Sequence, residues 1–209
     1  ARWQDDHSTQ EGANAGEQRA KDHRARISCR TAVPMHYSGD RHADRPFVLT
    51  WAAAYEKRMG STEPWLLDVI GPAAAGRGHY EPEEFVAVAR WKTPRSRQRI
   101  AANSDSDIRQ ITAMAFSAAE ELQHRVLTIL EGVRVPTATA LLAVAFPDRH
   151  TIVDFRSTES LSRLGEWDGQ GGYLAYLDVC RSLAVRLEVN LRTLDRALWQ
   201  WSKHGYPAT

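Results

Sequence analysis

Apolar residues recur at helical spacing along much of the chain, and no segment shows the sustained alternation that is typical of strands. The clearest stripe lies near the C-terminus, where one helix face would carry Leu191, Leu194, Leu198 and Trp201. This pattern predicts an all-α fold. The expected helices cover residues 51–59, 64–70, 82–89, 104–116, 117–130, 137–146, 155–164 and 173–187, with a last helix beginning near residue 190.

Side chains that favour helix starts mark three of these boundaries. Ser104, Asp154 and Asn190 each precede a helical pattern, and their residue types are preferred N-caps because their oxygens accept the first free amides. Residues 71–78 are instead rich in glycine and alanine, and we interpret them as a connector between helices.

The segment 117–146 predicts two helices joined by a tight turn. Gly132 supplies the backbone freedom needed to stop the first helix, and Pro136 suits the first turn of the second. A sharp turn of this kind leaves amides at the start of the second helix unpaired. A phosphate oxygen can accept hydrogen bonds from these amides, and such a contact binds DNA without recognising its base sequence. The expected apolar stripe of the first helix is Leu122, Val126, Ile129 and Leu130. The second helix, over residues 137–146, is apolar nearly all round, so we expect it to be buried.

Together with the aspartate that follows, this hairpin resembles the helix-hairpin-helix DNA glycosylase superfamily, most closely its 8-oxoguanine DNA glycosylase-like branch. The residues on matching positions are Gly132, Val133, Thr137, Ala138 and Asp154. The resemblance implies two helical lobes with a DNA cleft between them, and double-stranded DNA as the partner that the hairpin binds. It also implies a K⁺ or Na⁺ ion held by the backbone carbonyls of Thr128, Leu130 and Val133.

Asp154 has two interpretations. As a cap alone, it would hold the start of the helix predicted over residues 155–164. The resemblance adds a catalytic role. Amides at a helix start lower the pKa of a carboxyl group and keep it charged. When a glycosidic bond breaks, the sugar becomes cationic, and a fixed anion beside it stabilises that cation and can orient a water.

Two residues depart from the family's hairpin. Pro136 stands where strand-cleaving members carry a lysine that forms a Schiff base with the abasic sugar, so we expect a monofunctional enzyme. Lys92 is the alternative amine, delivered from a different loop. Arg134 replaces the second hairpin glycine, where a positive φ would cost on the order of 1 kcal/mol and a guanidinium–phosphate contact would offset that cost.

A basic stretch without acidic residues, residues 90–99, follows the helix predicted over 82–89. So short a run is ordinarily solvated surface, but beside this hairpin we expect DNA contacts and a stacking aromatic. Trp199 lies off the centre of the C-terminal stripe and is either a core residue or a wall of the base pocket. The further residues expected at the DNA or the extruded base are Trp91, Lys92, Arg95 and Arg156.

Composition constrains the class of protein. The 209 residues are 43% hydrophobic and 25% charged, which is ordinary for a globular domain, and the net charge of +1 means that DNA affinity must come from local patches. Residues 1–34 are polar and aperiodic, so we expect a flexible arm before a helical domain over residues 35–209. No apolar run approaches the length of a membrane span and no secretory signal is evident, which predicts a cytoplasmic protein without a membrane partner.

Cofactor chemistry is not expected beyond the hairpin ion. Cys29 and Cys180 are too few for a cysteine-ligated iron–sulfur cluster and are interpreted as free thiols. The histidines lack metal-ligand spacing. The glycine pair Gly71 and Gly76 lacks the lysine of a phosphate-binding loop, which argues against nucleotide hydrolysis. We expect a monomer.

The sequence therefore predicts a DNA glycosylase that flips a damaged or modified base out of the duplex and leaves an abasic site. Oxidised purine is the first expected substrate. The rival is a hypermodified cytosine of phage DNA, such as glucosylated hydroxymethylcytosine, excised as antiviral defence. The alternative function is a non-catalytic helix-hairpin-helix DNA-binding module, which would lack a placed aspartate and a base pocket.

Overall fold

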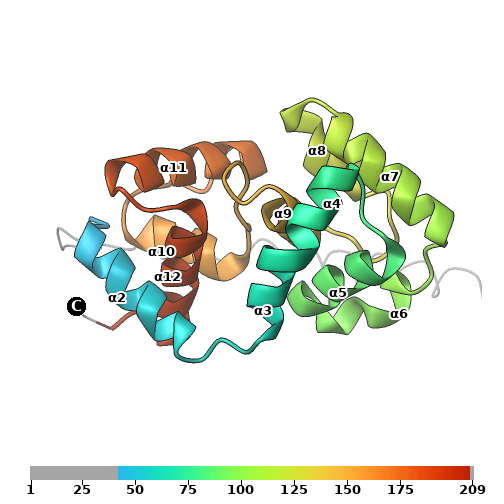
Figure 1. Ribbon diagram of the computed structural model, residues 1–209. Helices are drawn as coiled ribbons and strands as arrows, with labels where there is room; N and C mark the ends of the chain where they lie inside the picture. The colour runs from blue at the N-terminus through green and yellow to red at the C-terminus, as the bar shows by residue number, and fades with distance from the viewer. Residues whose placement is uncertain (1–41, 208–209) are drawn as a thin grey trace, which may run out of the picture. The chain divides into compact units, whose positions relative to one another are not determined.

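The computed structural model describes residues 42–207, and within this range the chain is helical with no strand (Figure 1). The predicted all-α class is confirmed for these residues. The flexible arm predicted over residues 1–34 and the predicted domain start at residue 35 lie outside them. The helices are α2 (Arg45–Glu56), α3 (Thr62–Trp65), α4 (Gly71–Arg77), α5 (Pro82–Lys92), α6 (Arg97–Ile100), α7 (Asp105–Ser117), α8 (Glu120–Leu127), α9 (Val135–Ala145), α10 (Phe155–Arg163), α11 (Gly172–Arg186) and α12 (Leu191–Lys203).

Capping side chains set helix starts where the sequence predicted them. The side chain of Ser104 accepts the amide of Asp107 at the start of α7, at 3.1 Å. The side chain of Asn190 accepts the amide of Thr193 at the start of α12, at 2.7 Å. Asp154 caps α10 in the same way. These three predicted N-caps are confirmed, and each satisfies an amide that its own helix leaves unpaired.

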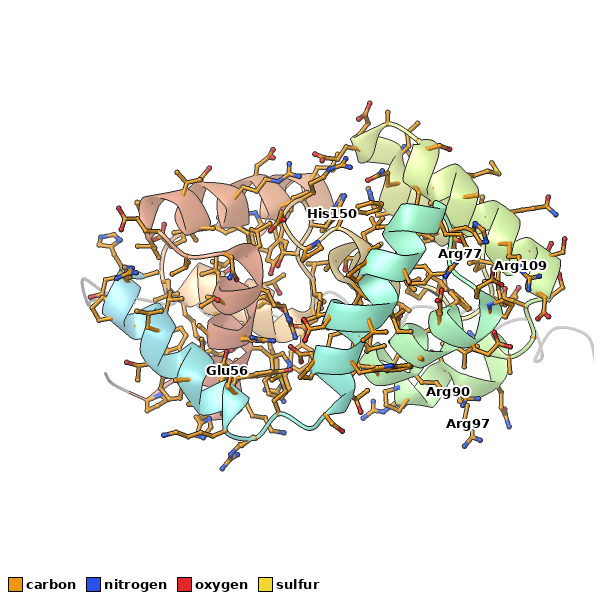
Figure 2. All side chains as sticks on the ribbon, viewed as in Figure 1. Glu56, Arg77, Arg90, Arg97, Arg109 and His150 are labelled. Atoms are coloured by element: carbon orange, nitrogen blue, oxygen red, sulfur yellow. The ribbon has the colours of Figure 1, made fainter. Side chains whose placement is uncertain are left out.

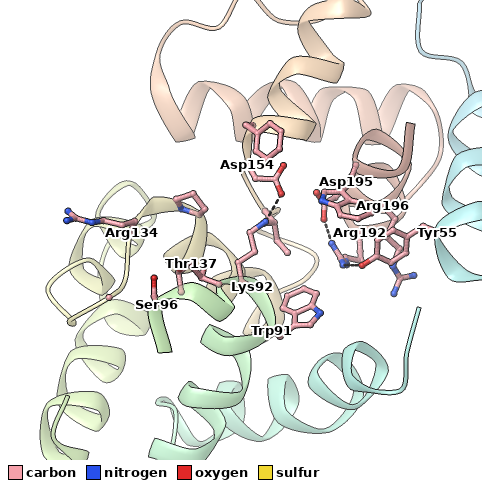
Figure 3. A pocket seen from close by; sticks show the side chains of 16 residues that line it. Tyr55, Trp91, Lys92, Ser96, Arg134, Thr137, Asp154, Arg192, Asp195 and Arg196 are labelled. Carbon is pink, nitrogen blue, oxygen red and sulfur yellow. Dashed lines mark hydrogen bonds and ion pairs between the residues drawn. The ribbon is translucent and has the colours of Figure 1, made fainter. Parts of the chain in front are cut away.

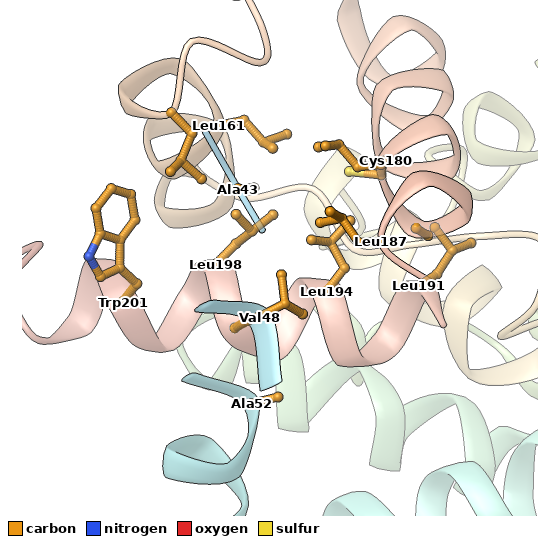
Figure 4. Close-up of a cluster of buried hydrophobic side chains, with 14 of the residues drawn as sticks. Ala43, Val48, Ala52, Leu161, Cys180, Leu187, Leu191, Leu194, Leu198 and Trp201 are labelled. Carbon is orange, nitrogen blue, oxygen red and sulfur yellow. The ribbon is translucent and has the colours of Figure 1, made fainter. Parts of the chain in front are cut away.

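Helices from the two ends of the described range share one hydrophobic core, which we call the terminal core. In it α2 packs against α12, and α10 and α11 complete the enclosure (Figures 1 and 4). The predicted stripe on α12 is buried in it. Phe47 of α2 meets Trp201 of α12 edge to face, with ring centroids 5.2 Å apart. Other buried members drawn in Figure 4 are Val48, Leu161, Leu194 and Leu198.

The middle of the chain, from residue 66 to the end of α9, forms a second core, which we call the central core. Its axis is α9, where every residue from Thr137 to Ala145 is buried, as predicted from the nearly unbroken apolar run. The hydroxyl of Tyr80 donates to the carbonyl of Leu141 at 2.7 Å, which satisfies a phenol that has no access to water.

The expectation of a connector over residues 71–78 is wrong, because most of it is helix α4. A π-helical segment, η1 (Leu66–Ile70), leads into α4 directly before Pro72, which has no amide to continue a regular helix. Gly71 lies so close to α9 that a Cβ there would come within 2.0 Å of the carbonyl oxygen of Val144. Small residues here allow two helices to approach closely, which explains the composition without a loop.

The first helix of the hairpin is shorter than predicted and buries a different face. Residue 117 ends α7, and α8 spans only Glu120–Leu127. Of the expected stripe, Leu122 and Ile129 are exposed, and Leu130 is buried as predicted. The other buried residues of this segment are Gln123 and Leu127, which the prediction did not include. The amide of Gln123 donates to the carbonyl of Phe116 and its oxygen faces His150, so a polar residue is satisfied inside the core. None of the described helices is long and apolar enough to cross a membrane.

Candidate active site

A cavity of about 610 Å³ lies where helices of the terminal core meet helices of the central core (Figure 3). Its walls come from α2, the end of α5, the hairpin turn before α9, the start of α10 and one face of α12. The lining residues that the sequence singled out are Trp91, Lys92, Gly132, Arg134, Pro136, Thr137, Asp154 and Trp199.

Asp154 is held from two directions. Its Oδ1 accepts the amides of Arg156 and Ser157 at 3.0 and 3.1 Å and the hydroxyl of Ser157 at 2.9 Å. Its Oδ2 accepts Lys92 Nζ at 2.6 Å (Figure 3). One oxygen is therefore fixed by the helix start, while the other faces the cavity and the lysine.

The environment keeps this carboxyl group charged. Burial by itself would raise the pKa of Asp154, but the charge of Lys92 and hydrogen bonds from Lys92 and Ser157 outweigh burial, and the pKa lies below the ordinary aspartate value. An anion that stays ionised at neutral pH while its side chain is only 14% exposed is able to stabilise a developing positive charge.

Lys92 reaches Asp154 from the opposite core. It is the last residue of α5, and its side chain is 15% exposed. The hydroxyl groups of Thr93 and Thr137 lie 2.8 Å apart and join the end of α5 to the start of α9. Thr139 then accepts the amide of Val153 at 3.2 Å, which holds the extended segment before Asp154. Hydrogen bonds to α9 thus position both Lys92 and Asp154.

The hairpin turn depends on one glycine. Gly132 has φ +77°, and a Cβ there would meet Arg99 at 2.9 Å and Ile100 at 3.0 Å. Asn103 closes the turn, since its side chain donates to the carbonyl of Glu131 at 3.0 Å and accepts the amide of Glu131 at 2.7 Å. Arg134 has φ −114°, so the strain considered for a non-glycine residue at that position does not arise.

Most hairpin residues of the resembled motif are buried. Val133, Thr137 and Ala138 have exposed fractions of 2% or less, so their side chains are not on the surface that DNA could contact. The amide of Thr137, in the first turn of α9, donates to the carbonyl of Arg134 at 2.9 Å, so one of the amides expected to be unpaired is satisfied within the turn. The side chain of Arg134 is exposed at the cavity mouth.

The carbonyl groups predicted to hold a monovalent cation belong to the end of α8 and the turn. That of Leu130 accepts the amide of Val133 at 3.1 Å. Thr128 follows the last residue of α8. The ion remains a prediction. Among the described residues, no group of three or more histidine, cysteine, aspartate or glutamate side chains converges on a metal position.

The two tryptophans predicted at the base pocket both line the cavity. Trp91 has the guanidinium of Arg192 over its ring at 5.5 Å. Trp199 meets Tyr55 edge to face at 5.6 Å. Trp91, Trp199 and Tyr55 also line a second cavity of about 330 Å³. Trp199 is half-buried, so it serves as a wall rather than as a core residue.

The two other predicted DNA contacts do not line the cavity. Arg156 lies against Trp199, with its guanidinium 5.6 Å from the centre of that ring, and donates to Ser202 at 3.3 Å. Arg95 lies in η2 (Pro94–Ser96), a short 3₁₀ turn after α5, where it is exposed. Arg90 and Arg97 belong to the same basic stretch (Figure 2).

Sequence reasoning missed the polar residues of the cavity wall on α12 and the buried Glu63 behind them, which pairs with Arg192 and Arg196. Glu63 of α3 is 2% exposed and accepts Arg192 at 2.7 Å and Arg196 at 2.8 Å. The hydroxyl of Tyr55 donates to the same carboxylate at 2.5 Å. Asp195 is also buried and pairs with Arg192. Burial raises the pKa of Asp195, and the charge of Arg192 opposes that rise. Arg192 and Arg196 lie four residues apart beside the apolar stripe of α12. This spacing was the one feature of the sequence that could have indicated the polar cluster.

Of the two predicted free thiols, Cys180 is a buried free cysteine in the terminal core, and Cys29 lies outside the described residues. Comparisons of the chain with protein-family models, with curated proteins and with solved structures found no match.

Proposed function

We propose that this protein is a DNA glycosylase, and that the cavity takes a base flipped out of duplex DNA. The observation that carries the proposal is the placement of Asp154: a charged carboxylate, locked at a helix start, lines a cavity of about 610 Å³ that lies beside the hairpin. A carboxylate that served only as a cap would need neither the cavity nor the lysine against its second oxygen.

The chemistry assigned to Asp154 is electrostatic. As the bond between the base and C1′ of the sugar breaks, the base leaves with the electron pair and the sugar becomes an oxocarbenium-like cation. Asp154 stabilises that cation and orients a water, which adds to C1′. The proton that the water loses neutralises the departed base, and the abasic sugar remains. Because the Asp154 side chain is largely buried, little water screens this attraction.

Surface chemistry supports DNA as the partner. Arg134 at the cavity mouth and the exposed residues Arg95, Arg97 and Arg99 supply positive charge on one side of the cavity, without an acidic residue in that stretch. Such contacts bind phosphate without reading sequence. Trp91 and Trp199 provide aromatic surfaces for the extruded base.

Oxidised purine is the first proposed substrate. The second cavity, of about 330 Å³, favours a second candidate, a cytosine with a bulky polar substituent. Because Tyr55, Trp91 and Trp199 line both cavities, a substituent could extend from one to the other past these rings. Excision of such a base would suit defence against phage DNA, whereas excision of an oxidised purine would suit repair.

The experiment is a screen for released base. Duplexes that carry single lesions, and genomic DNA of phages with modified cytosine, are incubated with the protein and with Asp154→Asn, and free bases are identified by mass spectrometry. Asparagine is also a good N-cap, so the variant keeps the helix start. We expect release of one class of base by the wild type, and a loss of at least about 100-fold in the variant.

The alternative, a non-catalytic binding module, predicts a different outcome. If the wild type binds DNA, with affinity that falls as salt rises, yet releases no base from any substrate in the panel, the catalytic assignment of Asp154 is wrong. Equal base release by wild type and Asp154→Asn would contradict it as well.

A further inference from the structure

An amine lies inside the proposed active site. Lys92 Nζ is 2.6 Å from Asp154 Oδ2, and both side chains line the same cavity (Figure 3). Among the lysines that the structure describes, no other lines this cavity: Lys57 is exposed at the end of α2, and Lys203 lines the second cavity. Within residues 42–207, the lysine amine placed to reach a sugar bound against Asp154 is therefore that of Lys92.

We infer that Lys92 is the nucleophile of a second activity, the cleavage of DNA at abasic sites through a Schiff base. This inference rests on the proposed function, since it uses the same cavity and the product of base excision. The expectation of a monofunctional enzyme rested on Pro136, which leaves the hairpin without an amine. Pro136 lines the same cavity, and α5 supplies the amine from another side.

The ion pair accounts for how the amine becomes reactive. A protonated lysine has no free electron pair, so its proton must leave first. Asp154 Oδ2 lies at hydrogen-bond distance and is positioned to accept it. The proton passes to Asp154 as the nitrogen approaches C1′, so Asp154 is a carboxylate while the base leaves and is neutral only during the attack of the amine.

The covalent steps balance without any oxidant or reductant. In the ring-opened abasic sugar, C1′ is an aldehyde. The nitrogen of Lys92 adds to C1′, and the aldehyde oxygen leaves as water with the proton that Asp154 had taken, which gives a protonated imine. Asp154, again a carboxylate, takes a proton from C2′, and the C3′–O bond breaks as the phosphate leaves with its electron pair.

Water then hydrolyses the conjugated imine. The amine of Lys92 is released, and the products are one strand end with an unsaturated aldehyde and another with a 5′-phosphate. The carbon–nitrogen bond lasts only until this hydrolysis, so a hydride donor that reduces the imine will make it permanent. This property separates the proposal from a purely electrostatic role for Lys92.

The test uses the full chain and a duplex with one preformed abasic site, made by enzymatic removal of a uracil. Sodium borohydride is added, and covalent protein–DNA adducts are resolved and mapped by mass spectrometry. We expect an adduct on Lys92 and, without borohydride, strand breaks that need no alkali. A duplex with tetrahydrofuran at the site, which has no aldehyde, gives neither.

Two variants complete the design. Lys92→Arg keeps a positive charge beside Asp154, and therefore the fold and DNA binding, but it cannot form the imine; we expect loss of both adduct and strand breaks. Lys57→Arg is the matched control and should retain both. The inference is overturned if the wild type binds abasic DNA without forming an adduct, if the adduct maps to another amine, or if Lys92→Arg still cleaves.

These outcomes are separate from those of the proposed function. The abasic duplex contains no base to excise at the reacting site, so adduct formation does not depend on glycosylase activity. Base release without an adduct would leave the glycosylase proposal standing and overturn the role of Lys92. An adduct on Lys92 without base release from any DNA would support the lyase and count against the glycosylase.

Discussion

At the scale of single residues, Asp154 combines the cap of α10 with the proposed catalytic anion. The two roles use different oxygens, because Oδ1 accepts the helix amides and Oδ2 faces Lys92. A substitution can therefore remove one role and keep the other.

Asp154→Ala should lower the free energy of unfolding by about 1 kcal/mol more than Asp154→Asn does, because alanine removes the cap. Both variants should lack base release. Urea denaturation of the two variants and the wild type measures the difference. Equal stability of the two variants would show that the cap contributes little, and retained base release in either would count against the catalytic role.

At the scale of helices, the close packing of α4 on α9 depends on Gly71. The carbonyl of Val144 occupies the position that a side chain at residue 71 would need. The glycine and alanine of residues 71–78, which suggested a loop, therefore reflect a close contact between two helices. Gly76 lies in the same helix, and a Cβ added there would have nothing within 4 Å, so it provides a matched comparison.

Gly71→Ala should destabilise the fold by about 1–3 kcal/mol, because α4 must move away from α9. Gly76→Ala should stabilise it by up to about 1 kcal/mol, since alanine restricts the unfolded chain and favours helix. Thermal unfolding of the two variants measures both effects. If both raise the melting temperature, the close approach at Gly71 is not as the structure has it.

Local signals in the sequence were enough for the helix caps, the hairpin glycine and the buried α9, because each depends on residues a few positions apart. They failed where the partner is distant. Lys92 and Asp154 are 62 residues apart, and Glu63 and Arg192 are 129 apart. A buried glutamate such as Glu63 cannot be distinguished from a surface residue until its arginines are placed beside it. The buried face of α8 was missed because Gln123, a polar residue, belongs to it.

At the scale of the whole molecule, His150 links helices of both cores. Its Nε2 lies 2.9 Å from the side-chain oxygen of Gln123 on α8, and its Nδ1 lies 3.1 Å from the hydroxyl of Tyr173 on α11 (Figure 2). The residue is 1% exposed. Burial lowers the pKa of His150 to about 4, with the charge of Glu120 opposing that shift.

This pKa predicts acid sensitivity of the fold. Between about pH 6.5 and pH 4 the unfolded chain binds a proton at His150 and the folded chain does not, so His150 by itself lowers the free energy of unfolding as pH is lowered through this window, by up to about 3 kcal/mol. Asp195 acts in the opposite sense, because burial raises its pKa to about 6 and the folded chain takes up a proton there first. The contribution of His150 is therefore the difference in pH dependence between the wild type and a variant without the imidazole, measured by urea denaturation.

His150→Gln is the control for the acid effect, since glutamine does not titrate. Between pH 6.5 and pH 4 the free energy of unfolding of the variant should fall less, or rise more, than that of the wild type as pH is lowered. His124, whose pKa burial also lowers, accounts for a remaining part. A pH dependence identical in variant and wild type would mean that His150 is not the group that titrates.

The most direct test of the central claim is single-turnover base release on the DNA that the screen identifies, with wild type and Asp154→Asn compared at matched DNA occupancy. Our account predicts that both proteins bind the duplex with similar affinity and that only the wild type releases the base at a measurable rate. Release at the same rate by the variant, or binding without release by the wild type on every DNA tested, would contradict it.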